Sequence, residues 1–396
     1  MSKWYPLCRP DADPSRPWLA SVHLWTETTL NIWAQHGYDQ DHGGFHDQLT
    51  QTGQPEDIPK RCRVQARQIY SFIEAGRLGW EGPWQELSTQ ALAFMLDHYR
   101  MTNGAMRSRV NRDGTPYDDV IDNYDQAFAI FALAHAYRVI PDQAIKAPAI
   151  EVLDYLRAHR AHPGGGFFED STQAPDPRTT PLLANPHMHL LEAALAWLDV
   201  GCKEPWQTLA DEIVALALGR FIDSSSGALR EFFDLDWQPV VGVQGRLVEP
   251  GHLFEWQWLL QRYANYAGPI VDKHALRKAV AQLYAFADRF GLRHDRTITV
   301  AALLTDGSLY DGASRVWPQT ERIKAAMLQA QVCPAEAKRY HQDASEAWYG
   351  LSPFLTVPMN GLWYDRITPS GKAIANASPA SSLYHLIGAM SALLSS

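Results

Sequence analysis

One short pattern occurs six times in this chain of 396 residues: a glycine, an apolar residue two positions later and, in most copies, an acidic residue two further on. The first glycines of successive copies are 61, 61, 62, 80 and 54 residues apart. A period near 60 is too long for one helix and suits two helices with their loops. Six such units predict a closed ring of helical hairpins with a site in its middle. The copies begin at Gly43, Gly104, Gly165, Gly227, Gly307 and Gly361.

Helical patterns lie before and after each glycine loop. In the segment that begins at Trp84, apolar residues recur at spacings of three and four, which is typical of a helix with one buried face. The helices that precede the loops are predicted at Pro17–Gln35, Pro83–Arg100, Ile145–Ala161, Glu204–Phe221, His274–Phe290 and Glu336–Leu351.

The helices that follow the loops are apolar over most of their circumference, as in the run from Ala127 to Ala134. A helix that is apolar nearly all round is buried on all sides, so this second set is predicted to form the inner ring. The pattern therefore predicts an all-α fold, an (α/α)6 barrel with short β-hairpins in its loops. These helices are predicted at Arg61–Leu78, Asn123–Arg138, Asn185–Val200, Glu249–Ala264, Trp317–Gln329 and Pro379–Ser395.

Composition excludes several classes of partner. The net charge is −9 with both signs interspersed and no basic stripe, which argues against binding to nucleic acid or an anionic membrane. No run of 18 apolar residues predicts a membrane span. No linker or low-complexity segment divides the chain, so we expect one domain over residues 1–396, as a monomer or homodimer. The four scattered cysteines, which form no C-x-x-C pair, favour free thiols and the cytoplasm: Cys8, Cys62, Cys202 and Cys333.

Polar residues gather at the beginnings of the predicted inner helices, where an apolar helix should not carry charge without a partner or a task. Since these helices run parallel, their beginnings meet at one mouth, and their positive ends favour electron-rich oxygen there. Glu249, His252 and Glu255 follow one helix side at three-residue spacing, which indicates a functional role. The next polar positions are Arg63, Gln65, Tyr124, Asp125, Asn185, His187, His189, Trp317, Glu321, Tyr384 and His385.

Some of these residues have a plainer interpretation. Asp125 and Gln65 fit the capping of helix ends equally well. His187 and His189 are two positions apart, which on a helix turns their rings about 200° from each other. They are therefore not expected to share a metal, and we expect neither a metal nor a cofactor. The glycine loops themselves are interpreted as turns without a catalytic role.

Six motifs, in order on the second helix of successive repeats, resemble the N-acylglucosamine 2-epimerase superfamily over nearly the whole chain. That superfamily includes mannose isomerases, other aldose–ketose isomerases and cellobiose 2-epimerases. The motifs are Lys60-Arg61-Cys62-Arg63-Val64-Gln65-Ala66-Arg67, Asn123-Tyr124-Asp125-Gln126-Ala127-Phe128, Asn185-Pro186-His187-Met188-His189-Leu190-Leu191-Glu192, Glu249-Pro250-Gly251-His252-Leu253-Phe254-Glu255-Trp256, Trp317-Pro318-Gln319-Thr320-Glu321 and Ser382-Leu383-Tyr384-His385.

The resemblance implies proton transfer on a free reducing sugar without metal or redox cofactor. His252 and His385 match the two acid/base histidines, and Arg246 matches the arginine that binds the carbonyl oxygen. The long spacing after the fourth glycine suggests that an extra loop, Asp234–Leu247, carries Arg246 over the sugar. Further substrate-binding residues are predicted to be Arg63, Tyr124, Asn185, His189, Glu249, Glu255, Trp317 and Glu321, with Glu255 or Glu249 holding His252 in one tautomer.

The substrate stays open at this point. Isomerisation of mannose and fructose is favoured, with N-acylglucosamine or cellobiose 2-epimerisation as the alternative and a 6-phosphate substrate also compatible. A glycoside hydrolase on the same barrel needs two opposed carboxylates, such as Asp125 with Glu249 or Glu321, and leaves both histidines without a task. A purely protein-binding role is a further alternative, which the acid/base set makes unfavourable.

Overall fold

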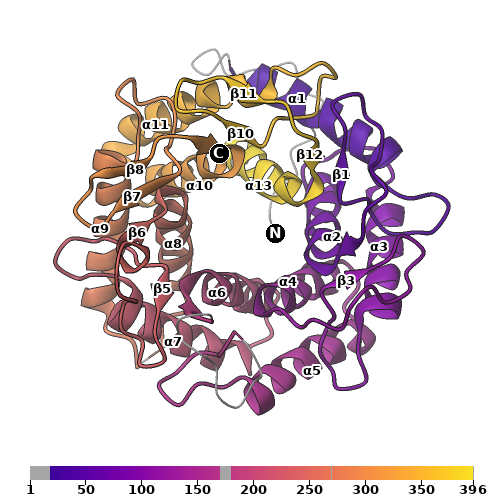
Figure 1. The fold of residues 1–396 in the computed structure, drawn as a ribbon, viewed down its shortest axis with the longest axis horizontal. Coiled ribbons are helices and arrows are strands. Elements are labelled where there is room, and N and C mark those ends of the chain that lie inside the picture. Colours follow the sequence, from indigo (N-terminus) through magenta and orange to yellow (C-terminus); the bar gives the residue numbers. More distant parts are fainter. Residues whose placement is uncertain (1–17, 170–179, 269, 396) are drawn as a thin grey trace.

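The computed structural model describes residues 18–169, 180–268 and 270–395, and this part of the chain is mostly helical, as the sequence predicts. Figure 1 shows the helices in two concentric rings around the middle of the molecule. None of the described helices is long and apolar enough to cross a membrane.

The outer ring is built from the helix that precedes each glycine loop (Figure 1). The predicted start at Pro17 lies outside the described residues, and the other ends agree with prediction to within a few residues. Short π-helical turns, η1 at Trp33–Gly37 and η2 at Ala217–Phe221, continue α1 and α7. The outer helices are α1 (Leu19–Ile32), α3 (Trp84–Tyr99), α5 (Gln143–His159), α7 (Trp206–Leu216), α9 (Lys273–Phe290) and α11 (Ala337–Gly350), with the short α12 (Ser352–Leu355) and η4 (Pro334–Glu336) beside the last.

The inner ring is built from the helix that follows each loop (Figure 1). In α4, 13 of 17 residues are buried, against 7 of 18 in the outer helix α9, which is the difference that the apolar circumference predicts. The last inner helix starts at Leu383 instead of Pro379, because Ser378 and Pro379 pair with another strand. The inner helices are α2 (Cys62–Arg77), α4 (Asn123–Val139), α6 (Ala184–Asp199), α8 (Pro250–Tyr263), α10 (Val316–Val332) and α13 (Leu383–Leu394), the last preceded by η5 (Ala380–Ser382).

Neighbouring inner helices contact one another around the ring, and α13 contacts α2, so the last repeat meets the first. Short antiparallel strand pairs tie successive repeats together at the mouth where the inner helices begin. The pair β1–β12 makes the same closure as α13 and α2. The strands are β1 (Gln48–Leu49), β2 (Lys60–Arg61), β3 (Arg109–Val110), β4 (Leu182–Leu183), β5 (Phe232–Phe233), β6 (Leu247–Val248), β7 (Ala302–Leu304), β8 (Leu309–Asp311), β9 (Ser314–Arg315), β10 (Arg366–Ile367), β11 (Ala373–Ile374) and β12 (Ser378–Pro379).

The glycine loops are fixed by backbone geometry. Gly227 has a φ of +81°, where a side chain is strained, and a Cβ there would lie 2.7 Å from the side chain of Gln282 on α9. Only glycine therefore allows the fourth loop to turn this close to the outer helix.

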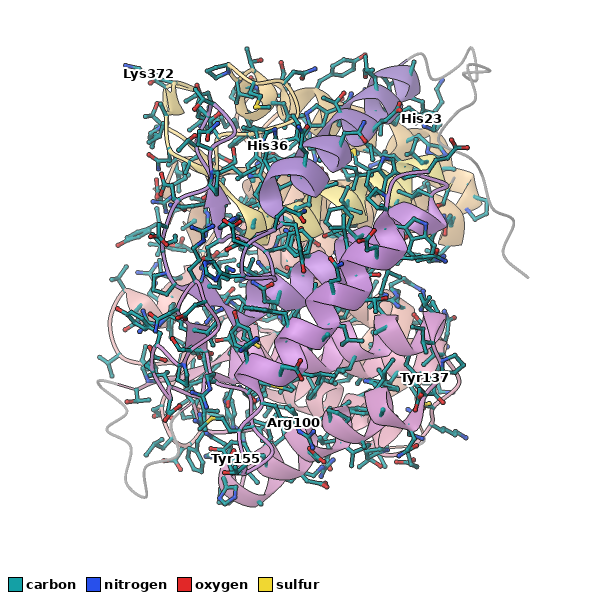
Figure 2. All side chains as sticks on the ribbon, turned by 90° about the vertical axis from the view of Figure 1, so that its right-hand side faces the viewer. His23, His36, Arg100, Tyr137, Tyr155 and Lys372 are labelled. Atoms are coloured by element: carbon teal, nitrogen blue, oxygen red, sulfur yellow. The ribbon has the colours of Figure 1, made fainter. Side chains whose placement is uncertain are left out.

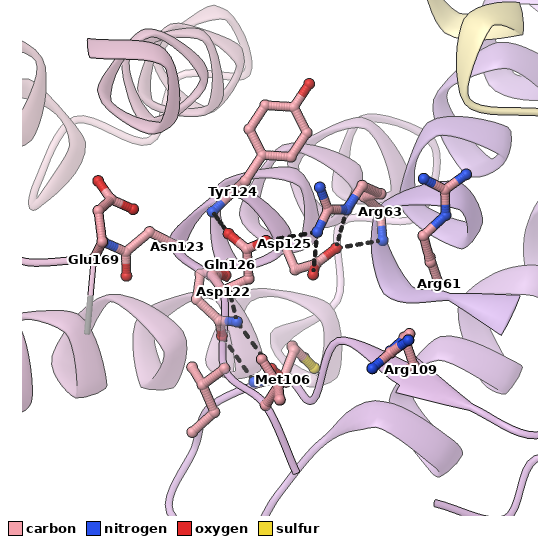
Figure 3. Close-up of polar contacts among 12 residues, drawn as sticks. Arg61, Arg63, Met106, Arg109, Asp122, Asn123, Tyr124, Asp125, Gln126 and Glu169 are labelled. Carbon is pink, nitrogen blue, oxygen red and sulfur yellow. Dashed lines mark hydrogen bonds and ion pairs between the residues drawn. The ribbon is translucent and has the colours of Figure 1, made fainter. Parts of the chain in front are cut away.

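In four repeats, a polar side chain near the start of the inner helix binds the loop that precedes it. Gln126 accepts a hydrogen bond of 2.8 Å from the Met106 N–H and donates one of 2.8 Å to the Met106 carbonyl (Figure 3). Each anchoring side chain lies twenty positions after the backbone group that it holds, which sets the loop against the mouth of the ring. The other pairs are Gln65 with Phe45, His187 with Phe167 and Gln319 with Thr299.

Candidate active site

The fold brings most of the predicted site residues to one place. They lie on the first turns of the inner helices, whose N-terminal ends surround the central mouth (Figure 1). Arg63 is on α2, Tyr124 on α4, Asn185 and His189 on α6, Glu249, His252 and Glu255 at the start of α8, Trp317 and Glu321 on α10, and His385 on α13.

His252 and His385 both lie against Trp317. The ring centroid of Trp317 is 4.9 Å from that of His252 and 5.6 Å from that of His385, and the planes are tilted by 33° and 34°. Gly251 makes room for this arrangement, since a Cβ on it would lie 2.4 Å from Trp317 Cζ3. The tryptophan therefore contacts two buried histidines that come from sequence positions 133 residues apart.

His252 is held as a cation. Its Nδ1 donates to Glu231 Oε1 over 2.9 Å and lies 4.0 Å from Glu249 Oε2. Burial alone lowers the pKa of His252, but the carboxylates of Glu231 and Glu249 outweigh burial and raise the pKa to about 10. His252 is thus an imidazolium at neutral pH, able to donate a proton.

The carboxylate that binds His252 differs from the prediction. Glu231 lies in the fourth glycine loop, and neither Glu255 nor Glu249 is hydrogen-bonded to His252 Nδ1. The interpretation of the loops as mere turns is therefore wrong for this copy, whose acidic residue acts on the site. The repeat pattern already marked Glu231, since it is the acidic member of the fourth copy.

His385 is held in the neutral state, in contrast to the cationic His252. Its Nδ1 donates to Glu321 Oε1 over 2.8 Å, and Lys324 Nζ donates to Glu321 Oε2 over 2.7 Å. Burial, with the nearby cations Arg67 and Lys324, lowers the pKa of His385 well below its usual value. The neutral ring therefore carries its proton on Nδ1, and Nε2 keeps a lone pair that can accept a proton.

A cluster of acids lies below the two histidines. Glu192 accepts hydrogen bonds from His189 Nδ1 at 3.1 Å and from the Tyr384 hydroxyl. Burial lowers the pKa of His189 to about 4, so this ring is neutral. Glu255 is also buried; desolvation and then Glu321 raise its pKa well above the usual value, which favours its protonated form.

These acids also form two groups that offer metal-type ligand atoms within 4.8 Å of one another: His189, Glu192 and Glu255, and Glu255, Glu321 and His385. The sequence spacing alone gave no sign of them. Most of these groups already have hydrogen-bond partners, whereas Glu255 Oε1 has none. The clusters therefore fit hydrogen bonding to a ligand at least as well as metal coordination.

Arg63 is fixed by two aspartates at the start of α4 (Figure 3). Its guanidinium binds Asp125 at 2.8 Å and Asp122 at 2.6 Å, and lies 4.9 Å from the centre of the Tyr124 ring. Asp125 also accepts a hydrogen bond of 2.9 Å from the Arg63 backbone N–H, so it satisfies the start of α2, as the sequence allowed, while Asp122 caps α4 at Tyr124 N–H.

Arg67 is a site residue that sequence reasoning did not single out. One turn after Arg63 on α2, it donates to the Tyr124 hydroxyl and to the Ser381 carbonyl. Its guanidinium lies 4.1 Å from the centre of the Phe128 ring, inside the ring of inner helices. The four-residue spacing from Arg63 is the signal that places both on one helix face.

Two predicted residues are less involved in this network. Arg246, on η3 (Gln244–Arg246), is half exposed and forms an ion pair with Asp306 at 2.8 Å. Arg246 thus lies at the rim of the mouth, where its partner is the carboxylate of Asp306. Asn185, on the first turn of α6, has a buried side-chain oxygen with no hydrogen-bond partner in the part of the chain that the structure describes.

A cationic and a neutral histidine beside one tryptophan define a site for general acid/base chemistry, and comparison with known proteins identifies the class as sugar isomerases and epimerases. The sequence model of N-acylglucosamine 2-epimerase (GlcNAc 2-epimerase) matches residues 43–389, and the chain belongs to that family.

Among its relatives, mannose-6-phosphate isomerase of Rhizobium meliloti (strain 1021) is 41% identical over 369 residues, which cover 92% of this chain and 93% of the relative. Cellobiose 2-epimerase of Bacteroides fragilis is 25% identical over 87% of this chain and 90% of the relative. A solved D-mannose isomerase has a TM-score of 0.81 at 20% identity, with 95% of this chain and 97% of that chain covered, which shows the same fold.

Proposed function

We propose that this protein is an aldose–ketose isomerase that interconverts D-mannose and D-fructose through an enediolate, without cofactor. Its two rings would constitute a single (α/α)6-barrel domain, a proposal supported by the alternation of inner and outer helices and by the contact between α13 and α2. The observation that carries the function is the opposite protonation of His252 and His385 beside Trp317.

The two protonation states suit the two roles in a proton transfer, since neutral His385 can act as the base and cationic His252 as the acid. In the open-chain aldose, neutral His385 would take the proton from C2 through Nε2, while the His252 cation donates a proton to the carbonyl oxygen O1. The enediol then loses its O2 proton to His252 and receives the C2 proton from His385 at C1, which gives the ketose. Proton count is conserved, since each histidine ends in the state in which it began.

The environment supports charge development on the sugar oxygens. Arg67 lies buried between the aromatic rings of Tyr124, Phe128 and Tyr384, where little water screens its charge. Arg246 remains our proposed ligand of the carbonyl oxygen, and it would exchange its surface pair with Asp306 for the substrate. Exposed pairs of this kind contribute little and are readily exchanged.

The remaining residues would hold the sugar. The Trp317 face offers a surface for the apolar C–H face of a pyranose, and Arg63, Tyr124 and Asn185 supply polar groups at the mouth. Neutral His189 and the carboxyl of Glu255, whose raised pKa favours the protonated form, can donate to or accept from hydroxyls, as ring opening requires. Glu249 lies at the rim and Glu321 orients His385.

The relative from Rhizobium meliloti is named for mannose 6-phosphate, and this chain offers an argument about that phosphate. Among the described residues, four arginines around the mouth are paired with carboxylates: Arg61 with Asp47, Arg63 with Asp125, Arg246 with Asp306 and Arg315 with Asp365. A phosphate on any of these four would have to displace an acid, which favours the neutral sugar, whereas Arg67 donates to a hydroxyl and a backbone carbonyl.

Two other reactions stand as alternatives. Epimerisation at C2 needs His252 to return a proton to carbon on the face opposite His385, and the placement of the histidines about Trp317 is compatible with it. Hydrolysis of a glycoside needs a free carboxylate pair, whereas Asp125 is bound by Arg63 and Glu321 by Lys324. The charged network thus supports proton transfer over hydrolysis.

The test is proton NMR in D2O with mannose, fructose, glucose, N-acetylmannosamine, cellobiose and mannose 6-phosphate. Appearance of fructose from mannose with deuterium at the exchanging carbon supports the proposal. Exchange with the N-acetyl sugar or with cellobiose alone would support an epimerase instead, and no exchange with any sugar would refute the enediolate mechanism.

Substitution of each proposed catalytic histidine tests whether these two residues transfer the proton. His252→Asn and His385→Asn should each reduce turnover by at least about 10², the usual contribution of a general acid or base. His274→Asn, on the exposed start of α9, is the matched control and should leave turnover unchanged. Full activity in both site variants would contradict the assignment.

A further inference from the structure

A second cavity lies at the other end of the ring from the site. It has a volume of about 770 Å³ and is lined by the C-terminal halves of all six inner helices. In Figure 2, Tyr137, which lines it, and Lys372, on the turn between β10 and β11, are on opposite faces of the molecule. The proposed sugar site and this cavity therefore open in opposite directions.

Three arginines converge on the cavity from different helices: Arg77 on α2, Arg138 on α4 and Arg262 on α8. Arg77 pairs with Glu74 at 2.6 Å and Arg262 with Asp199 at 2.5 Å. Arg138 has only the shared Asp199, at 3.9 Å. Three guanidinium groups thus face two carboxylates along this wall.

Helix dipoles explain part of this arrangement, because a basic residue in the last turn stabilises the exposed carbonyl groups of its own helix. The helix dipoles do not cancel the electrostatic repulsion among Arg77, Arg138 and Arg262. Burial, then Arg77 and Arg262, lower the pKa of Arg138, with Asp199 acting in the opposite direction. The wall around Arg138 therefore has a surplus of positive charge that an anion would relieve.

A second, independent feature points to a ligand in the same place. His135 lines the cavity one turn before Arg138, is only 6% exposed, and its Nδ1 has no hydrogen-bond partner among the described residues. Its ring is packed edge-on against Tyr70, with centroids 4.7 Å apart, so it cannot easily turn away. A buried polar atom without a partner costs about 1–3 kcal/mol, and a ligand oxygen at Nδ1–H would remove that cost.

We propose that this cavity binds an oxyanion, the phosphate or carboxylate group of a small metabolite, on Arg138, Arg262 and His135. Arginine forks match the geometry of both anions, and neutral His135 adds one donor. The volume exceeds that of a single oxyanion and leaves room for a sugar-sized body between Tyr70, Tyr137 and Trp258. This site is additional to the sugar site and does not depend on its function.

The cavity also shares residues with the hydrogen-bond network that contains the acid cluster and His385. Lys324, Glu192 and Tyr384 line it, and Lys324 is joined to His385 through Glu321. The cavity thus shares Lys324 with the hydrogen-bond chain that reaches the proposed catalytic histidine.

Isothermal titration of inorganic phosphate and of succinate, at constant ionic strength, tests the proposal and distinguishes the two anion types. At least one of them should bind the wild-type protein, and Arg138→Met should weaken it by about tenfold or more. Arg157→Met, which removes an exposed arginine paired with Glu212 on the outer ring, is the matched control and should bind as the wild type does.

His135→Phe tests the second feature without changing charge and covers the case in which Arg138→Met does not fold. It too should weaken the anion by several-fold. Saturating mannose should leave anion binding unchanged, whereas displacement by mannose would place the anion in the sugar site. Such displacement, absence of binding by both anions, or equal binding by all variants would overturn the proposal.

Discussion

The replacement Glu231→Gln isolates the group that keeps His252 protonated. The glutamine keeps the size of the side chain and removes its charge. The pKa of His252 rises from 6.5 to about 10 in the fold, which corresponds to roughly 5 kcal/mol in favour of the imidazolium. Glu231 is hydrogen-bonded at 2.9 Å while Glu249 is at 4.0 Å, so we assign Glu231 the largest share.

An opposite charge at hydrogen-bonding distance shifts a pKa by about one to three. The pKa of His252 in Glu231→Gln is therefore expected near 8, still above 6.5 because Glu249 remains beside the ring. If the reaction needs the cation, turnover persists below this pKa and is lost above it. The alkaline limb of the rate profile should move down by about two pH units, and kcat at pH 9 should fall by about tenfold.

The same shift has a consequence for stability. A raised histidine pKa stabilises the fold fully below the unfolded value of 6.5, and this contribution is lost as pH rises through about 10. In Glu231→Gln the loss should still begin near 6.5 but be complete at about pH 8, so the total contribution is smaller, which urea unfolding between pH 6 and pH 10 would measure.

The assay is the pH dependence of kcat from pH 6 to pH 10 for the wild type, Glu231→Gln, Glu249→Gln and the exposed control Glu81→Gln. Glu249→Gln should give a smaller displacement and Glu81→Gln none. An alkaline limb that stays in place in Glu231→Gln, with the enzyme folded, would refute the assignment of His252 as the cationic acid.

Two further replacements test the packing around the site. Gly251→Ala puts a methyl group 2.4 Å from Trp317 Cζ3, so the indole must move. The kcat should fall by about tenfold or more, and the near-UV dichroism of tryptophan should change. Unchanged kcat and dichroism would contradict the packing argument. Gln126→Leu leaves the buried N–H and carbonyl of Met106 unpaired and should cost about 2–4 kcal/mol in urea unfolding, whereas Gln90→Leu on the exposed face of α3 should change stability by less than about 0.5 kcal/mol.

The site illustrates which contacts a sequence can reveal. The inner positions of His252, Glu255 and Trp317 follow from local patterns, because each lies on the first turn of a helix whose apolar surface is visible in the chain. The hydrogen-bond partners of the site residues cannot be predicted from local patterns in the same way. Glu321 and His385 are 64 residues apart and come from different helices, and the sequence offered Glu321 only as a sugar ligand.

By itself, then, the sequence determined the six units, the helices within them, the order of inner and outer sets and the end of the ring where polar residues gather. These features depend on periodicity and on glycine geometry, which act over a few residues. Tertiary structure alone decided that Glu231 binds His252, that burial, Arg67 and Lys324 keep His385 neutral, that Arg67 lies inside the ring, and that a charged cavity opens behind it. Burial and the distances between charges set a protonation state, and both exist only once the ring has closed.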